Sequence, residues 1–248
     1  MVYVNLKCKR NYSMINIKRI FSTALLLTAF FTTAAQAQKI NQFDANGNRH
    51  GVWKKYYDDN KNKIRYSGEF KNGKEVGTFN FYEPNSYGVP SMSKEFSAKS
   101  DSAFVQFFTP KGKVKTKGWM IGRKRVGKWT YYFSDGKLFS EEEYVDGKLD
   151  GVLKNYYRNG KLTEESIYKN GEKNGLSKIF TEEGVMIEEV YYVDGKLEGE
   201  GRYYDLKGDL KEKGMYKNGK RDGKWQFYMD GEVVTDKRKR AVHSIPKN

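Results

Sequence analysis

The sequence predicts an all-β protein, an elongated, twisted single-layer antiparallel meander of about eight β-hairpin repeats of 24–26 residues. Three observations predict this fold. A glycine recurs at that spacing, an aromatic residue follows five positions later, and Asn-Gly or Asp-Gly pairs separate the intervening segments. Because aromatics make up 15% of the 248 residues, the chain carries too many rings for a disordered protein.

Residues 1–37 are typical of a secretory signal peptide. They hold five basic and no acidic residues, an apolar run over 20–31, and a cleavage motif at Ala35-Gln36-Ala37. A membrane anchor is the alternative, but the run is shorter than the roughly 20 residues that span a bilayer. Cleavage after Ala37 would remove Cys8, the only cysteine, which suits an oxidising compartment. We therefore expect an exported protein that is periplasmic, outer-membrane-associated or secreted.

The repeat domain is expected over residues 38–236. It aligns on eight anchor positions, seven of them glycine: Gly51, Gly77, Ala103, Gly127, Gly151, Gly175, Gly199 and Gly223. Five residues after each anchor stands an aromatic residue, and together these form the position-five column: Tyr56, Tyr82, Phe108, Tyr132, Tyr156, Phe180, Tyr204 and Tyr228. An aromatic at all eight positions indicates a structural spine, in which we expect each ring to stack on the next.

The turns divide each repeat into two strands. Pairs such as Asp146-Gly147 and Asn170-Gly171 tolerate the positive φ of a type I′ turn, whose twist suits a tight hairpin. Such pairs recur every 11 to 13 residues between segments of strand length, rich in Tyr, Phe, Val and Ile. Each repeat is therefore expected to be one hairpin, which gives about sixteen strands.

Alternation of side chains assigns the two faces of the sheet. Positions two and four after the anchor share one face, and position five points to the other. The first face is interrupted by Lys55, Asn155, Ser177 and Gly201, so it is the better place for specific recognition. Its exposed-ring candidates for a binding surface are Trp53, Trp129, Tyr131, Tyr203, Trp225 and Phe227.

The repeat unit resembles a known family. The segments Tyr144-Val-Asp-Gly-Lys-Leu-Asp-Gly151 and Tyr216-Lys-Asn-Gly-Lys-Arg-Asp-Gly223-Lys-Trp225 resemble the bacterial variant of the MORN repeat, over nearly all of residues 43–234. This class includes exported proteins and YwqK-type antitoxins. The resemblance implies a curved antiparallel sheet used for binding or scaffolding. It implies no catalytic residues, since the motif has none to carry over.

Residues 83–102 depart from the repeat. They lack the paired turn residues and contain two of the four prolines, and Ala103 then replaces the anchor glycine. Two interpretations stay open for this insert, a degenerate repeat or a loop specific to a partner.

Catalytic and metal-binding patterns are missing from the sequence. The carboxylate runs Glu141-Glu142-Glu143, Glu164-Glu165 and Glu188-Glu189 would be split between the two faces, whereas acid–base catalysis needs two carboxyls that converge. The only histidines are His50, in an expected turn, and His243, in an expected tail. We therefore predict a protein that is not an enzyme, with no catalytic residues, metal ligands or cofactor.

The formal net charge of +15 is concentrated partly in a basic tail over residues 237–248. This tail either keeps the protein soluble or contacts phosphate groups, but nucleic acid is not expected as a partner of an exported protein. The function predicted is the binding or scaffolding of a protein partner through the aromatic sheet surface, with antitoxin-like sequestration as one form. The alternative is a cell-envelope module that binds a glycan or an anionic lipid.

Overall fold

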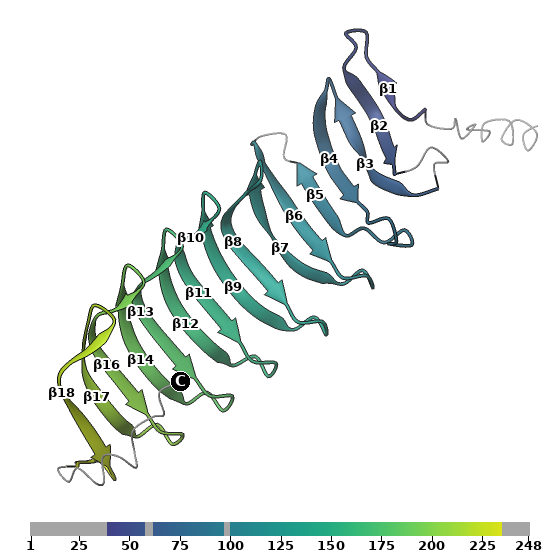
Figure 1. Cartoon of the computed structure of the whole chain (residues 1–248). Helices are drawn as coiled ribbons and strands as arrows, with labels where there is room; N and C mark the ends of the chain where they lie inside the picture. Colours follow the sequence, from purple (N-terminus) through teal and green to yellow (C-terminus); the bar gives the residue numbers. More distant parts are fainter. Residues whose placement is uncertain (1–38, 58–61, 97–99, 235–248) are drawn as a thin grey trace, which may run out of the picture. The chain divides into compact units, whose positions relative to one another are not determined.

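The protein is described by a computed structural model over residues 39–57, 62–96 and 100–234. The expected signal peptide and basic tail lie outside these residues. The described residues from Ile40 to Val234 belong to one unit. Its described residues contain strands and turns but no helix, and the strands follow one another in chain order across one sheet (Figure 1).

The N-terminal half of the sheet contains β1 (Gln42–Phe43), β2 (Arg49–Tyr56), β3 (Ile64–Lys71), β4 (Lys74–Phe81), β5 (Met92–Phe96), β6 (Ser102–Phe108), β7 (Val114–Ile121), β8 (Lys124–Tyr132) and β9 (Leu138–Val145). The C-terminal half contains β10 (Lys148–Leu149), β11 (Gly151–Tyr156), β12 (Leu162–Lys169), β13 (Glu172–Phe180), β14 (Met186–Val193), β15 (Lys196–Leu197), β16 (Gly199–Tyr204), β17 (Leu210–Lys217), β18 (Lys220–Met229) and β19 (Glu232–Val233).

Each strand pairs antiparallel with the next, except that β10 and β11 both pair with β9, and β15 and β16 both pair with β14. The predicted all-β antiparallel meander of hairpin repeats is therefore confirmed. The described residues hold 19 strands, where about sixteen were expected. The difference of three arises because Asp150 and Glu198 each interrupt a strand, and because the two-residue strand β1 is added before the first hairpin.

The anchor glycines have a conformational role. All seven adopt positive φ, for example 62° at Gly127 and 130° at Gly175. At Gly127 the register shifts, so that three residues of β8 lie opposite the single residue Gly118 of β7, which is a β-bulge. Ala103 has no positive φ, and the register of β5 and β6 is unbroken there. Glycine thus recurs because each bulge needs a left-handed residue.

Tight turns connect consecutive repeats along one rim of the sheet. Asp146 and Asn170 have φ of 51° and 52°, as the Asp-Gly and Asn-Gly pairs predicted. The N–H of the turn glycine donates to a carbonyl of the preceding repeat, for example from Gly147 to Arg125 and from Gly171 to Leu149, both within 2.9 Å. Each repeat is therefore fastened to its neighbour by the turn as well as by strand pairing.

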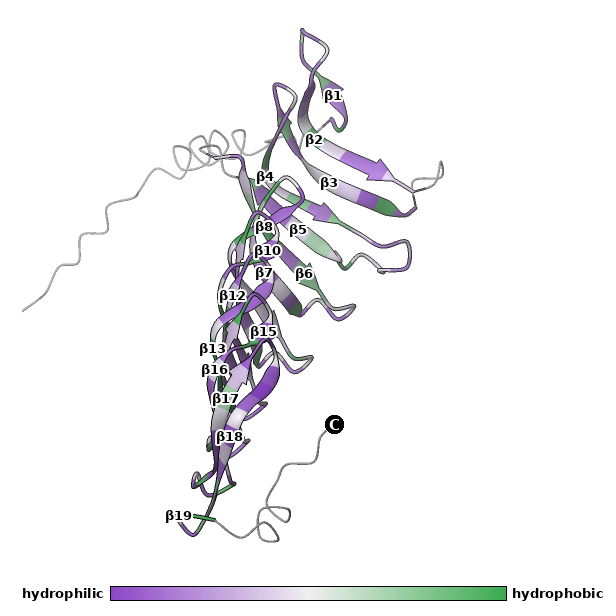
Figure 2. Ribbon diagram, turned by 60° about the vertical axis from the view of Figure 1, so that its left-hand side comes forward, coloured by the Kyte–Doolittle hydropathy of each residue, from purple (hydrophilic) through white to green (hydrophobic). Residues whose placement is uncertain are grey.

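The buried side chains gather on one face, which carries positions two and four and is called here the inner face. Its most deeply buried members include Phe79, Val105, Trp129, Ser166 and Val190. Strands of the C-terminal half appear nearly edge-on in Figure 2, as a single layer. The core is thus a set of side chains packed along one side of one sheet, and the opposite side is the outer face.

Candidate functional site

Large rings on the inner face lie over glycines of the neighbouring strand. A Cβ on Gly118 would overlap the ring of Trp129, and the same holds for Gly68 under Phe79 and Gly214 under Trp225. The Trp129 Nε1 donates to the backbone oxygen of Trp119 at 3.0 Å, so the indole is satisfied as well as buried. Each pair combines one large ring with a glycine, whose missing side chain leaves room for the ring to pack closely against the neighbouring strand.

Cations two residues before the anchor stack on these rings. The guanidinium of Arg125 lies 4.5 Å from the centre of the Trp129 ring, and that of Arg221 lies 3.9 Å from Trp225. Arg221 also binds the fully buried carboxylate of Glu212 at 2.7 Å. Such contacts add cation–π attraction to the ring packing and place charged groups over the rings of the inner face.

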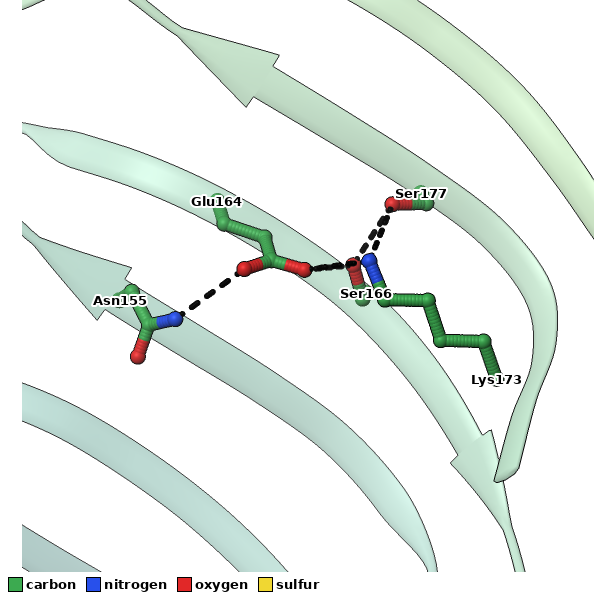
Figure 3. A network of polar contacts seen from close by, with 5 residues as sticks. All are labelled: Asn155, Glu164, Ser166, Lys173 and Ser177. Atoms are coloured by element: carbon green, nitrogen blue, oxygen red, sulfur yellow. Dashed lines mark hydrogen bonds and ion pairs between the residues drawn. The ribbon is translucent and has the colours of Figure 1, made fainter. Parts of the chain in front are cut away.

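A polar network replaces the rings at β12 and β13 (Figure 3). Ser177 occupies the position of a ring and Ser166 that of its glycine, and their hydroxyls lie 2.7 Å apart. The Glu164 carboxylate accepts hydrogen bonds from Ser166 and Lys173 at 2.7 Å each, and from Asn155 at 3.2 Å. Its charges are fully paired, so the network is a structural substitute for a ring.

The carboxylates of the inner face differ in their electrostatic surroundings. Burial alone would raise the pKa of Glu164, but hydrogen bonds from Lys173 and Ser166 outweigh it and hold that pKa below its usual value. Glu188, on the neighbouring strand β14, makes no comparable bond, and burial raises its pKa. The sheet thus stabilises the ionised form of one carboxyl and the neutral form of the other.

The six rings expected to form an exposed binding surface lie on the inner face. Trp129 is fully buried and Tyr203 is 9% exposed, so the expectation of exposure is wrong for both. The physical reason is the bulge, which tilts the position-two ring of Trp129 over the glycine of the preceding strand. The remaining four are half-buried: Trp53, Tyr131, Trp225 and Phe227. A partner can reach this face only in part.

The position-five column lies on the outer face, with all eight members half-buried. The expectation that its rings stack on one another is wrong, because no ring contact of the described residues joins two members, and most join inner-face rings. Members of the column contact charged groups instead. The hydroxyl of Tyr156 donates to Glu141 at 3.0 Å, and burial together with this bond raises the pKa of Tyr156 to about 12.

An exposed apolar cluster on the outer face was missed by the sequence analysis. It consists of Val152, Ile167, Leu176 and Tyr191, one from each of the strands β11 to β14, and is called the outer patch. Register pairs Val152 with Ile167 and Leu176 with Tyr191. Ile167, Leu176 and Tyr191 are 40%, 36% and 45% exposed. The sequence contains a signal for this cluster, because its four apolar residues stand one or sixteen positions after the anchors Gly151 and Gly175.

Ion pairs flank the outer patch. Lys154 binds Glu165 at 3.0 Å, and Glu189 lies 3.5 Å from Lys178 and 3.2 Å from Arg202. Adjacent carboxylates are split between the faces as expected, because Glu165 belongs to this outer row while Glu164 belongs to the inner network. An apolar centre beside a charged row has the composition of a protein–protein interface.

The remaining candidates are the two histidines and the insert over residues 83–102, and His243 lies outside the described residues. His50 is an exposed residue of β2 and not of a turn, and the described residues contain no group of three side chains suited to hold a metal ion. The same part of the chain has no helix long and apolar enough to cross a membrane. Of the insert, residues 83–91 form a loop, residues 92–96 form β5, and β6 begins at Ser102.

Comparison with known families identifies the regular half of the sheet. Four consecutive segments match the MORN repeat variant: residues 125–146, 149–170, 173–194 and 197–218. They run from β8 to β17 and include the polar network and the outer patch. A search among curated proteins finds no matching sequence. Residues 125–218 therefore match tandem repeats of the MORN variant, whereas the sequence resemblance extended over nearly all of residues 43–234.

Proposed function

We propose that this protein is an exported, non-enzymatic repeat protein that binds a protein partner through the outer patch. The observation that carries the proposal is the exposure of Ile167, Leu176 and Tyr191 on adjacent strands of one face. Apolar side chains gathered in this way, rimmed by charges, are typical of an interaction site. Export is supported by the composition of residues 1–37.

The partner should present an apolar surface edged by charges of both signs. Tyr191 offers a large ring at low cost in conformational entropy, and the row containing Lys154, Glu165 and Glu189 can form salt bridges around the contact. The rigid sheet holds these groups in register, so a partner meets a preformed surface. Binding of this kind either sequesters the partner, as an antitoxin does, or holds it in an assembly.

Site-specific photo-cross-linking tests the proposal. A photoreactive phenylalanine analogue in place of Tyr191 should cross-link one envelope protein in living cells. The same analogue in place of Phe139, which is 43% exposed, provides the matched control. Leu176→Lys should then reduce the Tyr191 cross-link by about tenfold or more, because it places a charge in an apolar contact.

The cross-link must depend on the patch and not on exposure alone. Val145→Lys introduces the same charge at a residue that is 60% exposed and outside the patch, and it should leave the Tyr191 cross-link unchanged. Equal cross-linking from Phe139 and Tyr191, or equal loss with Leu176→Lys and Val145→Lys, would show that the outer patch is not the binding surface.

A further inference from the structure

The loop between β4 and β5 carries a residue in an unfavourable backbone conformation. Tyr87 has a φ of 48°, in the left-handed region that bulky residues rarely occupy, while its side chain is 100% exposed. Gly88 follows with a φ of 85°, and Val89 closes the turn by donating to Ser86 at 2.9 Å. The exposed ring gains no packing within the described fold that would offset the backbone strain.

Other repeats show that this strain is avoidable. The corresponding loops of later repeats are short, for example over 133–137 and 157–161, and each is closed by glycine at the left-handed position, Gly136 and Gly160. The β4–β5 loop is longer and places tyrosine where glycine would cost less. Strained residues of this kind persist where function requires them.

The loop is nevertheless firmly held. Ser91 donates to the backbone oxygen of Phe81 at 2.8 Å through its N–H and at 3.2 Å through its hydroxyl. The hydroxyl of Tyr57, from the preceding repeat, donates to the backbone oxygen of Tyr82 at 2.8 Å. These hydrogen bonds hold the loop in place at the rim of the sheet, where the Tyr87 side chain is exposed.

A cavity of about 480 Å³ lies beside the ring. Ile64, Tyr82 and Pro84 supply apolar surface, and Lys63, Glu83 and Asn85 supply an ammonium, a carboxylate and an amide. The volume is in the range of small-ligand sites. Among the described lining residues, one positive and one negative side chain leave no net charge, which does not favour an anionic lipid surface.

We infer that the β4–β5 loop forms a carbohydrate-binding site, in which Tyr87 stacks on the apolar face of a neutral sugar ring and Glu83, Asn85 and Lys63 bond its hydroxyls. A pyranose combines one apolar face with a rim of donors and acceptors, so it matches a ring beside a carboxylate, an amide and an ammonium. This site goes beyond the proposed function, since it shares no residue with the outer patch and takes a different class of ligand.

Titration of the full chain with chitotetraose, cellotetraose and maltotetraose, followed by saturation-transfer NMR, tests the inference. At least one of these oligosaccharides should bind saturably at millimolar concentration. Tyr87→Ala should weaken that binding by about tenfold, and Tyr87→Phe should retain it, because the stacking surface is kept. Leu206→Ala, at a residue 77% exposed in the equivalent loop of a later repeat, is the matched control and should have no effect.

A second variant separates binding from folding. Tyr87→Gly relieves the left-handed strain, so it should keep or raise the melting temperature while sugar binding is lost. The inference is overturned if none of the three oligosaccharides binds saturably, if Tyr87→Ala binds as the wild type does, or if Tyr87→Gly lowers the melting temperature. It is equally overturned if Tyr87→Ala abolishes the protein cross-link at Tyr191, since Tyr87 would then be part of a protein interface.

Discussion

The ring-packed part of the inner face and the polar network at β12 and β13 share one backbone and differ in how they fill it. Trp129 covers Gly118 in the first, whereas Ser166 and Ser177 bond to each other in the second. The turn bonds are equivalent in both and the strand pairs on either side of the bulge correspond, while the bulge lies opposite Gly118 in the first and opposite Ile167, one position further along, in the second. Turn and anchor residues therefore specify this repeat, while its core accepts either rings or paired charges.

Removing a ring should have the largest effect. Trp129→Ala leaves a cavity in the core and should lower the free energy of unfolding by about 3–5 kcal/mol, measured by urea denaturation. Ser177→Ala in the polar network should cost only about 1 kcal/mol. Equal losses in the two variants would remove the distinction between a ring-packed and a polar region.

The ring and its glycine should also behave as one unit. Gly118→Ala forces a methyl group into the Trp129 ring and should cost about 1–3 kcal/mol. In a Trp129→Ala background the same substitution should cost far less, because the ring is gone. Additive losses in this double-mutant cycle would contradict the proposed complementarity of volumes.

Breaking the charge pair of the network should come next. Lys173→Met leaves the Glu164 carboxylate without its cation and should cost about 1–3 kcal/mol. Adding Glu164→Gln to that variant should restore part of the loss, because the unpaired charge is removed. A double variant less stable than Lys173→Met would show that the carboxylate is stabilised by something other than the lysine.

The anchor positions allow a reciprocal exchange between a bulged and a regular strand. Gly127→Ala places a Cβ at a φ of 62° and should cost about 1–2 kcal/mol. Ala103→Gly, in the strand without a bulge, should cost only about 0.5–1 kcal/mol through backbone entropy. The reverse order of the two losses would mean that the bulge does not depend on glycine.

The smallest effects should be the pH-dependent ones, and they should differ in sign. The lowered pKa of Glu164 contributes stability that is present above its unfolded value and is lost as the pH falls through the folded pKa. The raised pKa of Glu188 favours the neutral form, so its contribution is lost as the pH rises through the folded pKa. At neutral pH, Glu188→Gln should stabilise and Glu164→Gln should destabilise, with the Glu188 change below about 1 kcal/mol. Denaturation curves at acidic and neutral pH would reveal the opposite signs, and a shared sign would contradict them.

Local sequence patterns were enough to predict the hairpins, because each depends on turn residues within a few positions. Asp146-Gly147 and the spacing of the anchors predicted where strands end. The buried face could not be predicted in the same way. It depends on bulges that tilt Trp129 over Gly118, and this contact joins residues of two strands. Rings on a sheet surface were therefore interpreted as exposed when they form the core.

The outer patch was missed for a related reason. The outer face was predicted to carry a structural spine that includes Tyr132 and Tyr156, whereas its exposed apolar side chains include Ile167 and Leu176, which vary in type between repeats. The ion pairs that flank the patch depend on strand register, because each joins residues of two different strands. Which side chains of the outer face are exposed depends on which face of the sheet holds the core, and composition alone does not reveal that.

The bond between a turn and the preceding repeat has a consequence for how such a chain can lengthen. The turn glycines Gly171 and Gly219 donate to the backbone of a leucine, Leu149 and Leu197. The turn glycines Gly147 and Gly195 donate to the backbone of a cation, Arg125 and Lys173. Repeats with a leucine at the acceptor position (leucine-type) therefore alternate with repeats that have a cation there (cation-type). The pair Glu164–Lys173 crosses from one type to the other and recurs 48 residues later as Glu212–Arg221. Internal duplication of two hairpins keeps every cation beside its carboxylate, whereas duplication of one hairpin would put the alternation out of phase. The structural period of this half is thus a pair of hairpins.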